Sequence, residues 1–112
     1  MRSMIVAVWL VAFAALSSSA VLAQDTAAGE KLYTVQKCSM CHSIGGKGNP
    51  AGKLDDVGSR LSEEDIRQWL INTRVMTEKA KSTRKPVMPA YTKLTKEEVD
   101  SLVAYLKSLK KK

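Results

Sequence analysis

The stretch Cys38-Ser39-Met40-Cys41-His42 holds both cysteines and the only histidine of the 112-residue chain. Two thiols three positions apart, with an imidazole directly behind them, form a compact set of groups that bond to metals or reactive cofactors. A helical pattern precedes the stretch, and residues 43–58, which hold five of the six glycines, follow it. The reactive groups of this chain are therefore concentrated where a predicted helix meets an irregular loop.

Four interpretations of the two cysteines compete. A disulfide between Cys38 and Cys41 would close a very short loop and contribute little stability. A thioredoxin-like redox pair needs a preceding strand and a βαβ context, and the sequence predicts no strand there. Structural zinc normally takes four ligands, and the chain has no second Cys/His pair. The spacing C-x-x-C-H is the attachment signature of c-type haem, and this is the interpretation we favour.

Haem attachment gives each residue of the stretch a role. The thiols of Cys38 and Cys41 can each add across one vinyl group of the porphyrin. His42 then falls under the ring, where its imidazole can bind the iron from the proximal side. The sequence thus predicts one covalently attached haem c, with Cys38, Cys41 and His42 as cofactor-binding residues and His42 as an iron ligand.

The iron has a sixth position, and three methionines lie beyond the N-terminal apolar segment. Met40 lies between the two anchors and cannot reach the far face of the ring. Met76 follows the second predicted helix, where core packing is its expected role. Met88 lies between Pro86 and Pro89, which restrict the backbone on both sides. We predict Met88 as the second iron ligand; without it, the chain would suit a peroxidase or a gas-binding haem protein.

The first 23 residues have the pattern of an export signal. Arg2 supplies a positive charge, residues 4–16 are apolar, and Val21-Leu22-Ala23 places small or compact residues where a signal peptidase cleaves. We predict a signal peptide over residues 1–23, cleavage after Ala23, one domain over residues 24–112 and a periplasmic location. An uncleaved anchor is the alternative, because residues 4–23 could just span a bilayer.

Composition supports a domain that depends on a cofactor. The chain is 45% hydrophobic, but much of that share lies in the N-terminal segment, so the remaining domain is poor in apolar residues. A chain this short buries a limited part of its surface. Such domains usually need a disulfide, a metal or another staple, and bound haem would be one.

The chain is basic, with 18 Lys and Arg against 11 Asp and Glu and a formal net charge of +7. Many of the cations lie between Arg74 and Lys96, where the only acid is Glu78. A basic surface attracts nucleic acid, anionic lipid or an acidic protein. An exported chain rarely meets nucleic acid, so we predict an acidic protein partner; the alternative is a solvated face without one.

Helical patterns occur in three places, and no strand is predicted. A first helix from Thr26 to about Lys37 would carry the apolar stripe Ala28, Leu32 and Val35. Ser62 followed by three acids begins a second helix, whose inward face is formed by Ile66, Trp69, Leu70 and Thr73.

The last helix has the clearest pattern. Thr95 and Glu98 form a capping box, and its apolar positions repeat at helical spacing: Val99, Leu102, Val103, Leu106 and Leu109. Residues 43–58 and 74–91 are expected to be mostly loop, with a helical turn near residues 77–81.

These features resemble the small class I cytochromes c of bacteria over residues 25–109. The matching segments are Gly29-Glu30-Lys31-Leu32-Tyr33, Cys38 to His42, Leu54-Asp55-Asp56-Val57-Gly58, Trp69-Leu70, Met88-Pro89-Ala90-Tyr91 and the last amphipathic helix. The resemblance implies an all-α fold of three to four helices wrapped around one covalently bound haem. It implies that Gly29 and Tyr33 meet the last helix near Tyr105, and that residues 43–61 wrap the haem edge.

The resemblance also implies a function. We expect a one-electron carrier between redox proteins, not an enzyme, monomeric and in contact with a membrane only transiently or through a partner. Its acidic partner, an oxidase or reductase, would meet a haem edge ringed by the cations Lys47, Arg84, Lys85 and Lys93. A haem subunit of a larger oxidoreductase is the alternative.

One position departs from the family pattern. The family has a proline whose carbonyl accepts the hydrogen bond of the ligand histidine, and this chain has Gly52 there, with Pro50 slightly upstream. The sequence leaves open whether Gly52 or Pro50 orients His42.

Overall fold

The computed structural model describes residues 19–111, with side chains from residue 25 onward. The predicted signal peptide lies outside the described residues except for its last five, which begin helix α1 (Ser19–Val35). The leader and its cleavage after Ala23 therefore stay predictions. None of the helices in the described part has the length and hydropathy needed to cross a membrane.

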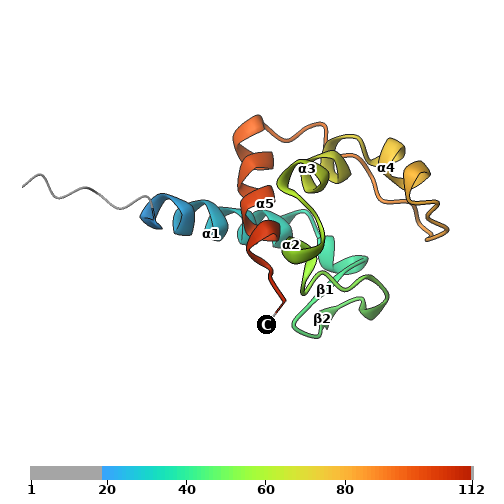
Figure 1. The fold of residues 1–112 in the computed structure, drawn as a ribbon, viewed down its shortest axis with the longest axis horizontal. Coiled ribbons are helices and arrows are strands. Elements are labelled where there is room, and N and C mark those ends of the chain that lie inside the picture. Colours follow the sequence, from blue (N-terminus) through green and yellow to red (C-terminus); the bar gives the residue numbers. More distant parts are fainter. Residues whose placement is uncertain (1–18, 112) are drawn as a thin grey trace, which may run out of the picture.

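The described chain is mostly helical, and the short elements fall between α1 and α3. In order, the elements after α1 are the 3₁₀ helix η1 (Cys38–Met40), strands β1 (Ser43–Ile44) and β2 (Lys47–Gly48), the 3₁₀ helix η2 (Pro50–Gly52), and helices α2 (Val57–Arg60), α3 (Glu63–Ile71), α4 (Thr73–Lys79) and α5 (Lys96–Ser108). Figure 1 shows α5 crossing α1, with α3 and α4 on one side and the two strands on the other.

Helices α1 and α5 cross at Gly29, as the resemblance implies. A Cβ at Gly29 would overlap the Ser101 carbonyl oxygen and lie 2.6 Å from Cβ of Tyr105. One turn further along, the rings of Tyr33 and Tyr105 meet edge to face with centroids 5.9 Å apart. Glycine at position 29 thus lets the two helix backbones touch.

Replacing Gly29 with alanine should destabilise the protein by about 1–3 kcal/mol. Alanine favours an isolated helix by about 1 kcal/mol over glycine, so a loss of stability would report the steric clash alone. The helices must separate to admit the methyl group, and overpacking in a tight contact costs about 1–3 kcal/mol or more. Thermal unfolding measures the effect, and Ala28→Gly on the exposed side of α1 is the control; an unchanged or higher melting temperature in Gly29→Ala would contradict the crossing.

The buried face of α1 differs from the predicted stripe. Val35 is 60% exposed and Ala28 is exposed, whereas Gly29 and Tyr33 are buried. Leu32 of the predicted stripe does pack against the core. The assignments of Ala28 and Val35 were wrong, because hydrophobicity alone ranks glycine as neutral, while the close approach of α5 places Gly29 on the inner face.

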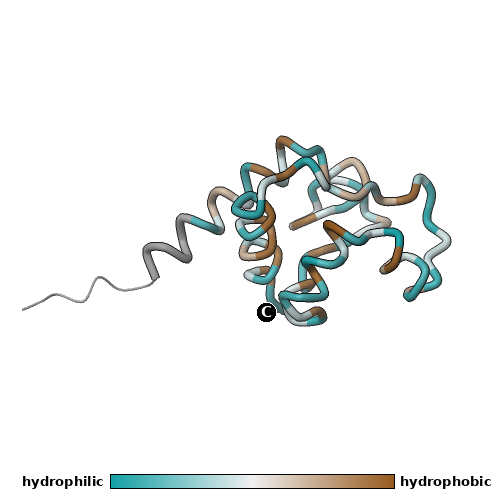
Figure 2. Tube along the Cα trace, turned by 90° about the horizontal axis from the view of Figure 1, so that it is seen from above, coloured by the Kyte–Doolittle hydropathy of each residue, from teal (hydrophilic) through white to brown (hydrophobic). Residues whose placement is uncertain are grey.

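The core lies where α1, α2, α3 and α5 meet. Its buried residues are Tyr33, Val57, Ile66, Leu70, Val99, Leu102, Val103 and Leu106. Hydrophobic positions alternate with hydrophilic ones around the helices (Figure 2), as amphipathic helices require. The predicted inward face is confirmed and continues from α3 into the first residue of α4: Ile66, Leu70 and Thr73 are buried, and Trp69 is partly buried.

The predicted starts of α3 and α5 are confirmed, whereas the start predicted at Thr26 is wrong, because α1 already includes Ser19 and Thr26 lies within it. The Ser62 hydroxyl accepts a hydrogen bond from the Asp65 N–H at 3.1 Å. Thr95 and Glu98 make the reciprocal bonds of a capping box, with N···O distances of 3.1 and 3.0 Å. These bonds satisfy backbone donors that the first turn of a helix leaves unpaired.

Several short elements differ from the sequence prediction. The expectation of no strand is wrong, because β1 and β2 pair around Gly45 and Gly46, whose φ angles of 60° and 78° suit a tight two-residue hairpin turn. Helix α4 overlaps the helical turn expected near residues 77–81 but begins earlier, at Thr73. The single turn α2 lies within residues 43–61, which are expected to wrap the haem edge as a loop. Residues 19–111 therefore hold five α-helices, more than the three to four expected.

Candidate cofactor site

The attachment stretch is a tight turn directly after α1. Lys37 ends the helical region in a left-handed conformation, with φ of 56°. The N–H groups of Cys41 and His42 then both donate to the Cys38 carbonyl, at 3.1 and 3.0 Å. This turn brings the two thiols and the imidazole to the same side of the chain. Met40 is 70% exposed.

The structure argues against the other interpretations of the cysteines. Both are free thiols, so no disulfide joins them. Burial raises the pKa of the Cys38 thiol, whereas a thioredoxin-like nucleophile needs a lowered pKa. Among the described residues, no cluster of three or more His, Cys, Asp or Glu side chains could hold a metal ion.

His42 is oriented by Gly52. Its Nδ1 lies 3.0 Å from the Gly52 carbonyl oxygen, and since a carbonyl only accepts, Nδ1 carries the proton and Nε2 keeps its lone pair. This contact decides between the two carbonyls in favour of Gly52 over Pro50. A Cβ at residue 52 would overlap the Cys41 carbonyl and approach Nδ1 of His42 to 2.8 Å, so the absence of a side chain allows the contact.

The His42 imidazole is held neutral. Burial lowers its pKa below the ordinary value, the hydrogen bond to Gly52 works in the opposite direction, and the nearby Arg84 charge lowers it further. Only a neutral imidazole with a free nitrogen can bind a metal ion. The hydrogen bond from Nδ1 also fixes the ring orientation, which is the usual second partner of a ligand histidine.

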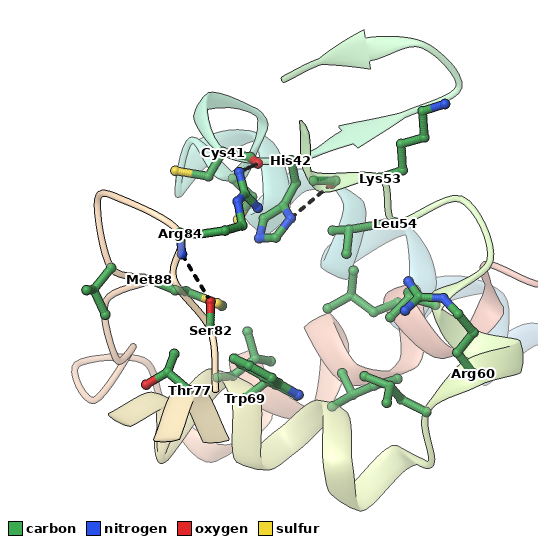
Figure 3. Close-up of a pocket in the computed structure, with 18 of the residues that line it drawn as sticks. Cys41, His42, Lys53, Leu54, Arg60, Trp69, Thr77, Ser82, Arg84 and Met88 are labelled. Atoms are coloured by element: carbon green, nitrogen blue, oxygen red, sulfur yellow. Dashed lines mark hydrogen bonds between the residues drawn. The ribbon is translucent and has the colours of Figure 1, made fainter. Parts of the chain in front are cut away.

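A cavity of about 540 Å³ opens in front of His42. Cys38, Cys41, His42 and Met88 all line it, and Met76 does not. Figure 3 shows His42 projecting from one wall, with Trp69 on another and Met88 on the segment that follows α4. The predicted cofactor-binding residues are thus brought together around one space, although they come from segments more than 40 residues apart.

The cavity fits a porphyrin in size and chemistry. Its volume falls in the ~300–1,000 Å³ range of cofactor sites. Most of its wall is apolar and is formed by buried and partly buried residues: Tyr33, Leu54, Val57, Leu61, Ile66, Trp69, Leu70, Leu102 and Leu106. The hydroxyl of Tyr33 is buried and has no hydrogen-bond partner within the described part of the chain. An apolar ring that fills this space would complete a core that the chain alone leaves hollow.

The four cations predicted around the haem edge are all exposed, but only Arg84 lines the cavity. Sequence reasoning missed the other cations that do so, Lys53, Arg60 and Lys81. It also missed that the Arg84 guanidinium donates to the Cys41 carbonyl at 2.8 Å. No sequence signal connects residues 43 positions apart, and only the folded chain shows the contact.

Two comparisons show what the chain is similar to. A family model described as cytochrome c matches residues 26–110. Cytochrome c oxidase subunit 2 of Alkalihalophilus pseudofirmus is 29% identical over 91 residues, which are 73% of this chain and 25% of that protein. The chain thus spans about a quarter of the length of this relative. No solved structure gives a significant match.

Proposed function

The chain belongs to the cytochrome c family of haem electron-transfer proteins, and from this premise we propose that it carries single electrons between redox proteins in the periplasm. The observation that supports the proposal best is the shared cavity of Cys38, Cys41, His42 and Met88. A donor set of two thiols, one imidazole and one thioether could provide two anchors and two iron ligands. If His42 and Met88 both held the iron, no coordination site would be open for a substrate.

Each residue has a separate task in this proposal. Haem supplies a one-electron Fe(III)/Fe(II) couple when bound. The Cys38 and Cys41 sulfurs hold the ring in place, and His42 offers Nε2 to the metal while Gly52 fixes its orientation. Met88 offers a soft, neutral sulfur, which favours the ferrous state and raises the reduction potential. The apolar wall excludes water and limits the reorganisation that accompanies a change of charge.

The partner is proposed from charge. The chain has a formal net charge of +7, and the exposed side chains of Arg84 and Lys85 lie on the segment that leads to Met88. Four exposed cations, Lys47, Arg84, Lys85 and Lys93, form what we call the cationic group. None of them takes part in a salt bridge within the described residues. Free cations steer an acidic partner and raise its association rate.

The rate of electron transfer with an acidic redox partner should fall as salt is added. The Debye length shortens from about 30 Å at 0.01 M to about 8 Å at 0.15 M, so a steered rate should drop at least several-fold. Stopped-flow mixing at increasing ionic strength measures it, and Lys85→Gln with Lys93→Gln should flatten the dependence. An electron-transfer rate that does not change with ionic strength would contradict the proposal of an acidic partner.

A haem subunit of a larger oxidoreductase is the second candidate. It is favoured by the similarity to a quarter of a cytochrome c oxidase subunit, because such a domain can also work while attached to a complex. Co-purification of the native protein with large subunits would favour this candidate, and a monomer on size exclusion would favour the free carrier.

Export remains part of the proposal, since a periplasmic location requires the domain to cross the membrane, whether the leader is then removed or kept as an anchor. Gln24 as the first residue of the purified protein would support cleavage after Ala23. A chain that still begins at Met1 would support the membrane anchor.

A further inference from the structure

The segment from Ala80 to Val87 connects α4 to Met88 and has little support of its own. All of its residues are exposed. The N–H groups of Lys81 and Ser82 donate back to α4, at 3.1 and 3.0 Å, and the Arg84 N–H donates to the Ser82 hydroxyl at 3.4 Å. Segments with few buried contacts open at low free-energy cost. The segment before Met88 therefore needs a contact with another part of the chain to stay in place.

The other side of Met88 is well anchored. The Thr73 hydroxyl, which is buried, lies 2.8 Å from the Trp69 carbonyl and 3.3 Å from the Pro89 carbonyl. The Tyr91 N–H donates to the Leu70 carbonyl at 2.8 Å. These contacts hold the chain that follows Met88 against the end of α3.

The side chain of Arg84 makes this contact. Its Nη2 donates to the Cys41 carbonyl at 2.8 Å, a residue of the attachment stretch itself. Its Nη1 also packs against Gly52: a Cβ added to residue 52 would lie 2.5 Å from this Nη1 atom. Figure 3 shows the guanidinium reaching beside His42 from the segment that carries Met88. One side chain therefore joins the Met88 side of the cavity to the His42 side.

We propose that Arg84 is a positioning residue that latches the exposed segment before Met88 onto the Cys41–Gly52 backbone and so keeps Met88 in place at the cofactor. This role rests on the proposed function, in which Met88 is an iron ligand. The guanidinium suits it because its planar set of donors can bond one carbonyl while its flat face packs on a glycine. Lysine could supply the charge but not both contacts.

The test is competition between Met88 and an added ligand in the purified, haem-loaded protein. Imidazole is titrated into the ferric form, and its binding is followed by the haem absorption spectrum. The variant Arg84→Gln removes the latch. Lys79→Gln is the control, because Lys79 is an exposed cation of α4 outside the cavity, and its loss changes the net charge equally.

Arg84→Gln should bind imidazole about tenfold more tightly than the wild type, the scale of one charged hydrogen bond. Lys79→Gln should bind it as the wild type does. The variant Arg84→Lys keeps the charge, and its imidazole affinity should lie between those of Arg84→Gln and Lys79→Gln. If Arg84→Gln does not accumulate as haem-loaded protein, Arg84→Lys is compared with Lys79→Gln instead. Equal imidazole affinity in the Arg84 variants and Lys79→Gln would overturn the latch.

Failure of the proposed function would look different. If Met88 is not an iron ligand, the wild type and Met88→Ala bind imidazole equally well, whatever the Arg84 variants do. If Met88 is a ligand but Arg84 does not secure it, Met88→Ala differs from the wild type while Arg84→Gln matches it.

Discussion

The double variant Cys38→Ser, Cys41→Ser should contain no covalently bound haem, whereas the wild type should hold one per chain. Serine hydroxyls are far weaker nucleophiles than thiols and do not form the thioether bond. Denaturing gel electrophoresis followed by haem staining measures this loss. Ser39→Ala, which changes an exposed residue between the two anchors, should stain like the wild type.

The same double variant should also lose most of its helical structure. The cavity of about 540 Å³ is walled by core residues of α1, α2, α3 and α5, so an unfilled site leaves their apolar side chains facing water. A domain this small has little stability in reserve. Far-UV circular dichroism measures the helical content; a cooperative thermal transition at the wild-type temperature would contradict a cofactor-dependent core.

Replacing Met88 with alanine should open the sixth iron position and turn a carrier into a ligand-binding protein. Carbon monoxide should then bind the ferrous form readily, whereas the wild type should show little binding. The reduction potential should fall, on the order of 100 mV within the ~0.8 V range that axial ligands control, because a soft sulfur that favours Fe(II) is lost.

Met76→Ala is the matched control for this experiment. It makes the same Met→Ala change in α4, at a position that does not line the cavity. Its carbon monoxide binding and potential should stay close to the wild type. If Met88→Ala and Met76→Ala behave alike in both measurements, Met88 does not bind the iron, and a peroxidase or gas-binding role becomes the better proposal.

Local signals made much of this site predictable. The spacing of Cys38, Cys41 and His42 and the prolines around Met88 are encoded within a few residues, and the structure places all four side chains around one cavity. The N-cap of α3 and the capping box of α5 are equally local, because they depend on hydrogen bonds three residues apart.

Features that depend on distant contacts could not be predicted in the same way. The inner face of α1 follows from the approach of α5 to Gly29, which no local hydrophobic pattern expresses. The choice of Gly52 over Pro50 depends on how the loop folds back onto His42. The contact of Arg84 with Cys41 spans 43 residues, and in the sequence Arg84 reads only as one more cation of a basic segment.

The mass of the intact, denatured protein tests the central claim most directly. After export in a host that matures c-type haem, the account predicts the mass of the polypeptide from Gln24 to Lys112 plus one haem, retained through acidified acetone. A mass equal to the polypeptide alone, or a pigment that the acetone removes, would show that the porphyrin is not bonded to Cys38 and Cys41 and would contradict the account.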